Sequence, residues 1–194
     1  ELQSFLAIPE FRNDRIDPIA MAQYFRYGYI PHPRTVYEQI RSLPPGSFLK
    51  KDKETISIVC YWKPYVTGVK KSLDYDELHR HFDRSVKLRL RTDVPLGMFL
   101  SGGIDSALVA ASAARQLNEP PKTFTVSTGQ YPCDESEEAL RTAKLLKTNH
   151  HTLRVNPDFV EISLKLAQHF GQPFADFSAI PTYYISAATR EFVK

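Results

Sequence analysis

The segment 100–106, Leu-Ser-Gly-Gly-Ile-Asp-Ser, constrains the fold of this chain more than any other feature. The apolar stretch 94–100 predicts a short buried strand, and the alanine-rich stretch 107–114 predicts a helix. A turn from a strand into a helix gathers unpaired backbone N–H groups at the helix N-terminus, where an anion is stabilised. The adjacent glycines Gly102 and Gly103 let a phosphate approach the backbone. We therefore predict a phosphate-binding turn, with an ordinary capped turn as the alternative.

Asp105 lies in this turn, although a carboxylate repels phosphate. Its presence is explained if Mg²⁺ lies between the carboxylate and the phosphates. The turn lacks the lysine of the Gly-Lys-Ser/Thr phosphate loop and the third glycine of the dinucleotide-binding fingerprint. The block Ser-Gly-Gly-Ile-Asp-Ser instead resembles the pyrophosphate-binding loop of the N-type ATP pyrophosphatases, a superfamily that includes asparagine synthetase, NAD synthetase and tRNA-thiolating enzymes. The resemblance implies cleavage of ATP between its α and β phosphates.

Helices and short apolar strands alternate from residue 70 onward, which predicts an α/β fold with a doubly wound parallel sheet. In such a sheet the ligand binds beyond the carboxyl ends of the strands, so Leu100 and Val126 border the predicted crevice and residues 101–106 form its floor. The strands are expected at 94–100, 122–127 and 150–155, and the helices at 75–90, 107–114, 134–146, 157–170 and 179–194.

Residues 1–66 have a different, mixed α+β pattern. Asp17 and Pro18 are typical of a helix start, and Gly28 of a helix end. Two apolar runs, 47–49 and 55–62, flank a polar segment and predict a hairpin.

Composition narrows the functional classes only modestly. The net charge of +3 is small and its basic residues are dispersed, so we expect no nucleic-acid partner. Cys60 and Cys133 have no metal-ligand spacing and indicate reduced thiols in the cytoplasm. No apolar run is long enough to cross a membrane, and no signal peptide is visible.

Several further blocks occur in the order typical of the asparagine synthetase B-type, glutamine-hydrolysing amidotransferases, and the chain resembles that family over nearly its whole length. The resemblance implies that residues 1–66 are the C-terminal remnant of a glutaminase domain with its linker. Residues 67–194 then correspond to a truncated first part of the ATP-pyrophosphatase domain. The blocks are 27–31, 43–46, 61–62, 93–97, 101–106, 134–135, 150–151 and 173–176.

The resemblance also implies roles for individual residues. The main chains of Leu100 and Val126 correspond to positions that hold adenine, and Asp105 to a Mg²⁺ ligand. Asp176 corresponds to the side of the site that faces the acyl acceptor, although a helix cap before residue 178 explains it equally well. Pyrophosphate would be held by Ser101, Gly102, Gly103 and Ser106.

Two pairs of adjacent residues that could bind a metal, one acidic and one of histidines, have simpler structural explanations. Asp134 and Glu135 suit the first turn of a helix, with a metal-binding role as the alternative. His150 and His151 lie next to each other on a predicted strand and therefore point to opposite faces. Because one ion cannot easily bind both, we expect them to be structural or to border the site.

The implied enzyme is a ligase that uses ATP and Mg²⁺ to adenylate a carboxylate such as aspartate, and then amidates it with ammonia from glutamine. The N-terminal cysteine of the glutaminase and the family's second nucleotide loop are not in this sequence. We therefore expect a fragment with no glutaminase activity, little ligase activity and no identifiable catalytic residue. The apolar residues of 1–66 would lack the partner sheet of a complete glutaminase, so we expect them to pack on the ligase half of the chain or on a second copy as a homodimer. They are Phe5, Leu6, Ile8, Phe48, Ile56, Ile58 and Trp62.

Two other functional classes stay open at this point. The first is a non-catalytic nucleotide-binding or interaction module. The second is another pyrophosphatase-type enzyme such as a tRNA thiolase, which would need a reactive cysteine pair and a basic face.

Overall fold

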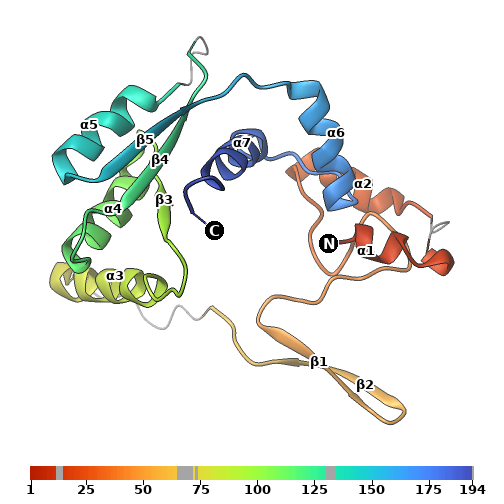
Figure 1. The fold of residues 1–194 in the computed structure, drawn as a ribbon. Coiled ribbons are helices and arrows are strands. Elements are labelled where there is room, and N and C mark those ends of the chain that lie inside the picture. The colour runs from red at the N-terminus through yellow and green to blue at the C-terminus, as the bar shows by residue number, and fades with distance from the viewer. Residues whose placement is uncertain (12–14, 65–71, 73, 130–133, 194) are drawn as a thin grey trace. The chain divides into compact units, whose positions relative to one another are not determined.

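The computed structural model describes residues 1–11, 15–64, 72, 74–129 and 134–193. They form two compact units, one made of Glu1–Lys70 with Phe159–Phe177 and the other of Lys71–Asp158 with Ser178–Lys194 (Figure 1). The first contains helices α1 (Gln3–Leu6), η1 (Pro9–Phe11, a 3-10 helix), α2 (Pro18–Tyr27) and α6 (Phe159–Phe170), and strands β1 (Ser47–Asp52) and β2 (Thr55–Cys60). The second contains helices α3 (Tyr75–Arg89), α4 (Ile104–Gln116), α5 (Ser136–Leu146) and α7 (Ala179–Thr189), and strands β3 (Gly97–Phe99), β4 (Lys122–Ser127) and β5 (Asn149–Arg154).

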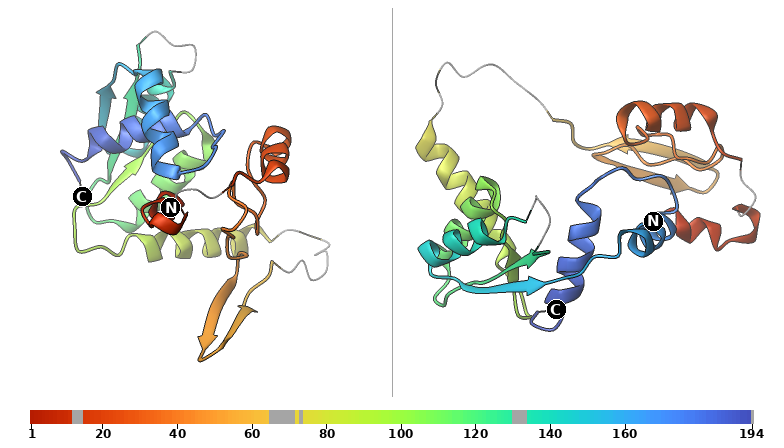
Figure 2. Two further views of the ribbon diagram at one scale, coloured as in Figure 1. Left: turned by 90° about the vertical axis from the view of Figure 1, so that its right-hand side faces the viewer. Right: turned by 90° about the horizontal axis from the view of Figure 1, so that it is seen from above.

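The second unit is built on a three-stranded parallel sheet of order β3-β4-β5. Phe99 pairs with Phe124, and Lys122 pairs with Asn149. Helices α4 and α5 cover one face of the sheet and α7 covers the other, as both views of this unit show (Figure 2). The predicted α/β fold with a parallel sheet is therefore confirmed.

Small residues fill the core between the sheet and its two crossover helices. Leu100, Ala110, Ala139 and Ala143 form one buried cluster, and each is almost fully enclosed. Alanines let α4 and α5 approach the carboxyl end of β3 closely, since no larger side chain separates them. This packing fixes the start of α4 next to the start of α5.

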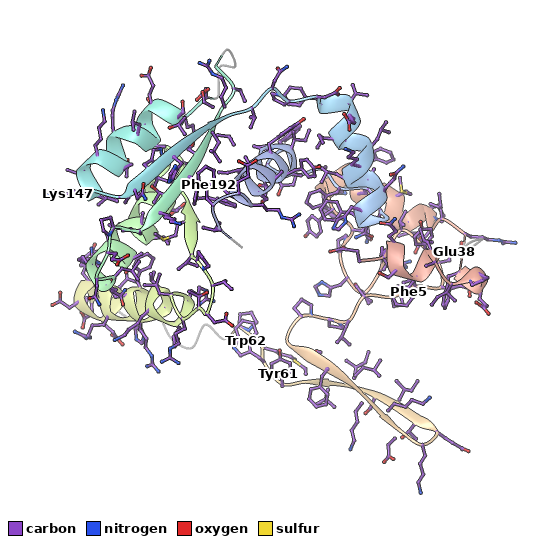
Figure 3. All side chains as sticks on the ribbon, viewed as in Figure 1. Phe5, Glu38, Tyr61, Trp62, Lys147 and Phe192 are labelled. Atoms are coloured by element: carbon purple, nitrogen blue, oxygen red, sulfur yellow. The ribbon has the colours of Figure 1, made fainter. Side chains whose placement is uncertain are left out.

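Aromatic rings fill the opposite face of the sheet. The ring of Phe124 is fully buried, and its centroid lies 5.2 Å from the ring of His151 and 5.5 Å from that of Phe192. Phe192, labelled in Figure 3, follows α7 and anchors the end of the chain against β4. Gly97 is required beneath this cluster because a Cβ there would lie 2.4 Å from the Phe124 ring.

Strand β3 and helix α7 are clearly shorter than the sequence predicts. Strand β3 covers only residues 97–99 of the expected 94–100, because Pro95 has no N–H for a ladder and the Thr92 hydroxyl holds the Val94 backbone in a local turn. Helix α7 ends at Thr189 and does not continue to residue 194. The Thr189 hydroxyl donates to the Ile185 carbonyl, and a turn then returns Phe192 to the sheet.

The first unit contains the predicted capped helix and hairpin. The carboxylate of Asp17 accepts hydrogen bonds from the N–H groups of Ile19 and Ala20 and pairs with Arg34, while Gly28 ends α2 at φ 76°. These N–H and guanidinium contacts hold the pKa of Asp17 below its usual range, against the opposing effect of burial.

Strands β1 and β2 pair antiparallel, and the N–H groups of Tyr61 and Trp62 both donate to the Gly46 carbonyl at the base of the hairpin (Figure 3). The apolar residues expected to lack a partner surface are exposed except for Leu6: Phe5, Ile8, Phe48, Ile56, Ile58 and Trp62. Among the described residues, no helix has the length and apolar character needed to span a membrane.

Candidate functional site

The turn at the carboxyl end of β3 leads, as its sequence predicts, into a helix, and the first N–H groups of that helix have no acceptor among the described residues. Ser101–Gly103 form the turn, and α4 begins at Ile104, so residues 104–106 are the first helical turn. Gly103 is the N-cap residue, and no side chain caps the helix there. The N–H groups of this first turn therefore remain available to an external anion.

Two serine hydroxyls make hydrogen bonds to each other and to the backbone of the turn. The Oγ atoms of Ser101 and Ser106 lie 2.8 Å apart, and the Ser106 hydroxyl accepts a 3.1 Å hydrogen bond from the Ser101 N–H. The Ser101 hydroxyl in turn accepts from the Gly103 N–H at 3.1 Å. Both hydroxyls thus hold the backbone of the turn in a fixed curve.

Gly102 lies against the start of α5. A Cβ at this position would lie 3.0 Å from the Glu138 Cβ and 3.3 Å from the Glu135 Cβ, so a side chain would push the turn away from the helix. The Gly102 N–H donates a 2.9 Å hydrogen bond to Oε2 of Glu135. The sequence indicates that Glu135 opens a helix but does not predict this contact with the turn.

Asp134 joins the end of β4 to the start of α5. One oxygen, Oδ2, accepts from the Ser127 hydroxyl and the N–H groups of Thr128 and Gly129, each at 2.8 Å. The other accepts from the Ser136 N–H at 2.9 Å. These contacts, led by those with Ser136, hold the pKa of Asp134 far below its usual range although partial burial opposes them.

The sheet leaves free backbone groups next to the turn. Among the described residues, the ladder between β3 and β4 ends at the 2.8 Å hydrogen bond from the Leu100 N–H to the Phe124 carbonyl. Because alternate residues of a parallel strand bond to the same neighbour, the N–H and C=O of Val126 face this side too. They lie past the end of β3, where a planar base with a donor and an acceptor can pair with them.

Asp105 projects from the first turn of α4 and is exposed. It makes no ion pair or hydrogen bond within the described ranges, so its carboxylate is available to a hard cation. No group of three or more His, Cys, Asp or Glu residues gathers in the described parts of the chain. A single exposed carboxylate is compatible with a magnesium ion that would take its other ligands from phosphate oxygens and water.

The two histidines occupy opposite faces of β5, as their spacing predicts. Nδ1 of His150 lies 2.9 Å from the Thr123 hydroxyl, whereas His151 stacks on Phe124. Burial, with a smaller effect from His151, lowers the pKa of His150. Their contacts are those of packed structural residues.

Asp176 belongs to the first unit, and the turn that follows β3 belongs to the second. Asp176 lies two residues before Ser178, the N-cap residue of α7. Both its expected roles, toward an acyl acceptor or as a helix cap, stay predictions.

Comparison with known proteins gives two family matches along the chain. The model described as asparagine synthase matches residues 77–194, and the glutamine amidotransferase domain matches residues 1–62. The putative asparagine synthetase [glutamine-hydrolyzing] 2 of Methanocaldococcus jannaschii is 33% identical over 200 residues, which cover 100% of this chain and 39% of that protein. Asparagine synthetase [glutamine-hydrolyzing] 1 of Bacillus subtilis is 32% identical over 187 residues, which cover 94% of this chain and 29% of that protein.

The chain therefore spans well under half the length of these curated relatives. Among solved structures, an NH3-dependent NAD synthetase from Campylobacter jejuni aligns with a TM-score of 0.41 and 20% identity, over 61% of this chain and 52% of that one.

Proposed function

Because this chain belongs to the asparagine synthase family, we propose that it forms the nucleotide-binding part of an ATP-dependent, amide-forming ligase. In the proposed reaction an oxygen of a carboxylate, such as that of aspartate, attacks the α-phosphorus of ATP and pyrophosphate leaves. Ammonia from glutamine then attacks the acyl carbon, and AMP leaves with the electrons of the broken bond. The fold is proposed to be that of the N-type ATP pyrophosphatases.

The observation that carries this proposal is the uncapped turn between β3 and α4. The free N–H groups at the start of α4 and the hydroxyls of Ser101 and Ser106 are suited to an anion with several oxygens, and pyrophosphate is such an anion. Fixed donors of this kind stabilise the charge that develops on the leaving group without having to reorganise. We assign pyrophosphate binding to Ser101, Gly102, Gly103 and Ser106.

The remaining assignments follow from what surrounds the turn. The main chains of Leu100 and Val126 are assigned to adenine, since a free edge of the sheet lies beside them. Asp105 is assigned to Mg²⁺, which would screen the phosphates and polarise their oxygens. Asp176 is assigned to the acyl-acceptor side on the resemblance alone.

Residues 1–66 are proposed to be the end of a glutaminase domain with its linker, and residues 67–194 the first part of the ligase domain. We also propose a cytoplasmic location and a homodimer through the exposed apolar residues of the first part. On its own, the chain is proposed to lack glutaminase activity and to have little ligase activity.

The test is calorimetric titration of this chain with MgATP, comparing wild type with Asp105→Asn. We expect the variant to bind roughly tenfold more weakly, because a charged metal ligand is replaced by a neutral one. Glu119→Gln is the matched control, since it removes one exposed carboxylate near the amino ends of the strands. Equal affinity of wild type and Asp105→Asn would contradict the metal role, and absence of MgATP binding by wild type would contradict the proposed function.

A further inference from the structure

The Glu135 carboxylate occupies a donor that the turn would otherwise offer to a phosphate. Its Oε2 accepts the Gly102 N–H at 2.9 Å. Glu135 is the N-cap residue of α5, yet its side chain makes no capping bond to its own helix. The carboxylate is therefore committed to the neighbouring turn instead of its own helix end, where capping side chains usually bond.

We propose that Glu135 is an internal competitor of pyrophosphate, whose carboxylate leaves the Gly102 N–H when a phosphate oxygen binds and returns when it departs. This inference rests on the proposed function, because it assigns a second anion to the same turn. A carboxylate oxygen and a phosphate oxygen accept the same kind of charge-assisted hydrogen bond from a backbone N–H. The Gly102 N–H can make a well-aligned hydrogen bond to only one of these two oxygens at a time.

The geometry favours a competitor over a permanent clamp. Glu135 and Gly102 are both exposed, so the carboxylate can move into water without leaving a buried charge. The start of α5 does not depend on the Glu135 side chain, because Asp134 holds the Ser136 N–H and the end of β4. Movement of Glu135 therefore leaves the scaffold around the turn in place.

The consequence is a lower affinity for pyrophosphate than the turn alone would have. When a group of the protein itself competes for the donor, the apparent dissociation constant equals the intrinsic one divided by the fraction of molecules in which the donor is free. For a reaction that releases pyrophosphate, such competition speeds departure of the product, since the N–H is satisfied at once by the returning carboxylate.

The first experiment measures pyrophosphate binding by calorimetry without Mg²⁺, so that no metal ligation contributes. Glu135→Ala is expected to bind pyrophosphate about three- to tenfold more tightly than wild type, which is the factor for one exposed charge-assisted hydrogen bond. Glu135→Gln should lie between them, because its amide oxygen still accepts the bond but carries no charge.

Glu138→Gln is the matched control. This substitution removes one negative charge from the same helix, close to Gly102. The Glu138 carboxylate accepts no hydrogen bond from the turn, since Glu135 accepts the Gly102 N–H. If Glu138→Gln tightens pyrophosphate binding as much as Glu135→Ala, the effect is general repulsion between the carboxylates of α5 and pyrophosphate, and the proposal is overturned. Weaker binding by Glu135→Ala also overturns it, because Glu135 would then shape the turn for its ligand.

A second measurement separates this proposal from the proposed function. Amide hydrogen exchange of Gly102 without any ligand should be faster in Glu135→Ala than in wild type, while exchange of the buried Ala110 amide should be unchanged and so report an intact fold. If wild type and all variants fail to bind pyrophosphate, the proposed function falls and this proposal with it. Unchanged Gly102 exchange together with normal pyrophosphate binding overturns the competitor role alone.

Discussion

Replacement of Asp134 should destabilise the second unit by a measurable amount at neutral pH. Its carboxylate accepts four hydrogen bonds, from Ser127, Thr128, Gly129 and Ser136. A buried hydrogen bond to a charged group contributes about 1.5–3 kcal/mol to stability. The Asp134 site is partly exposed, so water can bond to the four donors when the carboxylate is removed, and each bond contributes less. Counting about 0.5 kcal/mol for each, we expect Asp134→Ala to lose about 2 kcal/mol.

Asp134→Asn should lose about half as much. Its single amide oxygen can still accept from the three donors that share Oδ2, but its NH₂ group then faces the Ser136 N–H. The loss should also depend on pH in a defined direction. Because the folded-state pKa of Asp134 is lowered, the stabilisation is complete above the unfolded value of about 4 and is lost as the pH falls toward the folded value.

The assay is native-state hydrogen exchange of the buried Phe124 and Ala139 amides in this unit, between pH 7 and pH 3. Fluorescence of Trp62, the single tryptophan, follows the first unit during urea unfolding and serves as the internal control. A loss below about 0.5 kcal/mol at pH 7, or one that stays undiminished under acid conditions, would refute the reasoning.

Two further substitutions test the packing of the site. Gly102→Ala should weaken pyrophosphate binding roughly tenfold in calorimetry, because its Cβ would lie 3.0 Å from the Glu138 Cβ and displace the turn; unaltered affinity would mean that the turn and α5 separate freely. His150→Gln should reduce the acid sensitivity of the second unit, measured as hydrogen exchange between pH 7 and pH 5. The folded-state pKa of His150 is lowered, so its neutral form stabilises the fold above the unfolded value of about 6.5, and this contribution is lost as the pH falls; equal slopes in variant and wild type would contradict this.

Local chemistry was sufficient to predict most elements of the chain. Asp17, Pro18 and Gly28 bound α2 as expected, because capping and a positive φ depend on neighbours within one turn. Strand β4 matches its predicted range, 122–127, and the turn at Ser101–Gly103 connects a strand to a helix as predicted. The ends of β3 and α7 were predicted less well, since a proline and a tertiary aromatic contact decide them.

The sequence by itself determined the α/β class, the strand-to-helix turn at 101–103 and the opposite faces of His150 and His151, because each depends on periodicity or on residues adjacent in the chain. Only the tertiary structure decided that Glu135 reaches the Gly102 N–H across 33 residues of chain. It also decided that the backbone of Val126 lies past the end of β3. These contacts depend on which strands become neighbours and where each one ends, and residue spacing along a single chain does not contain that information.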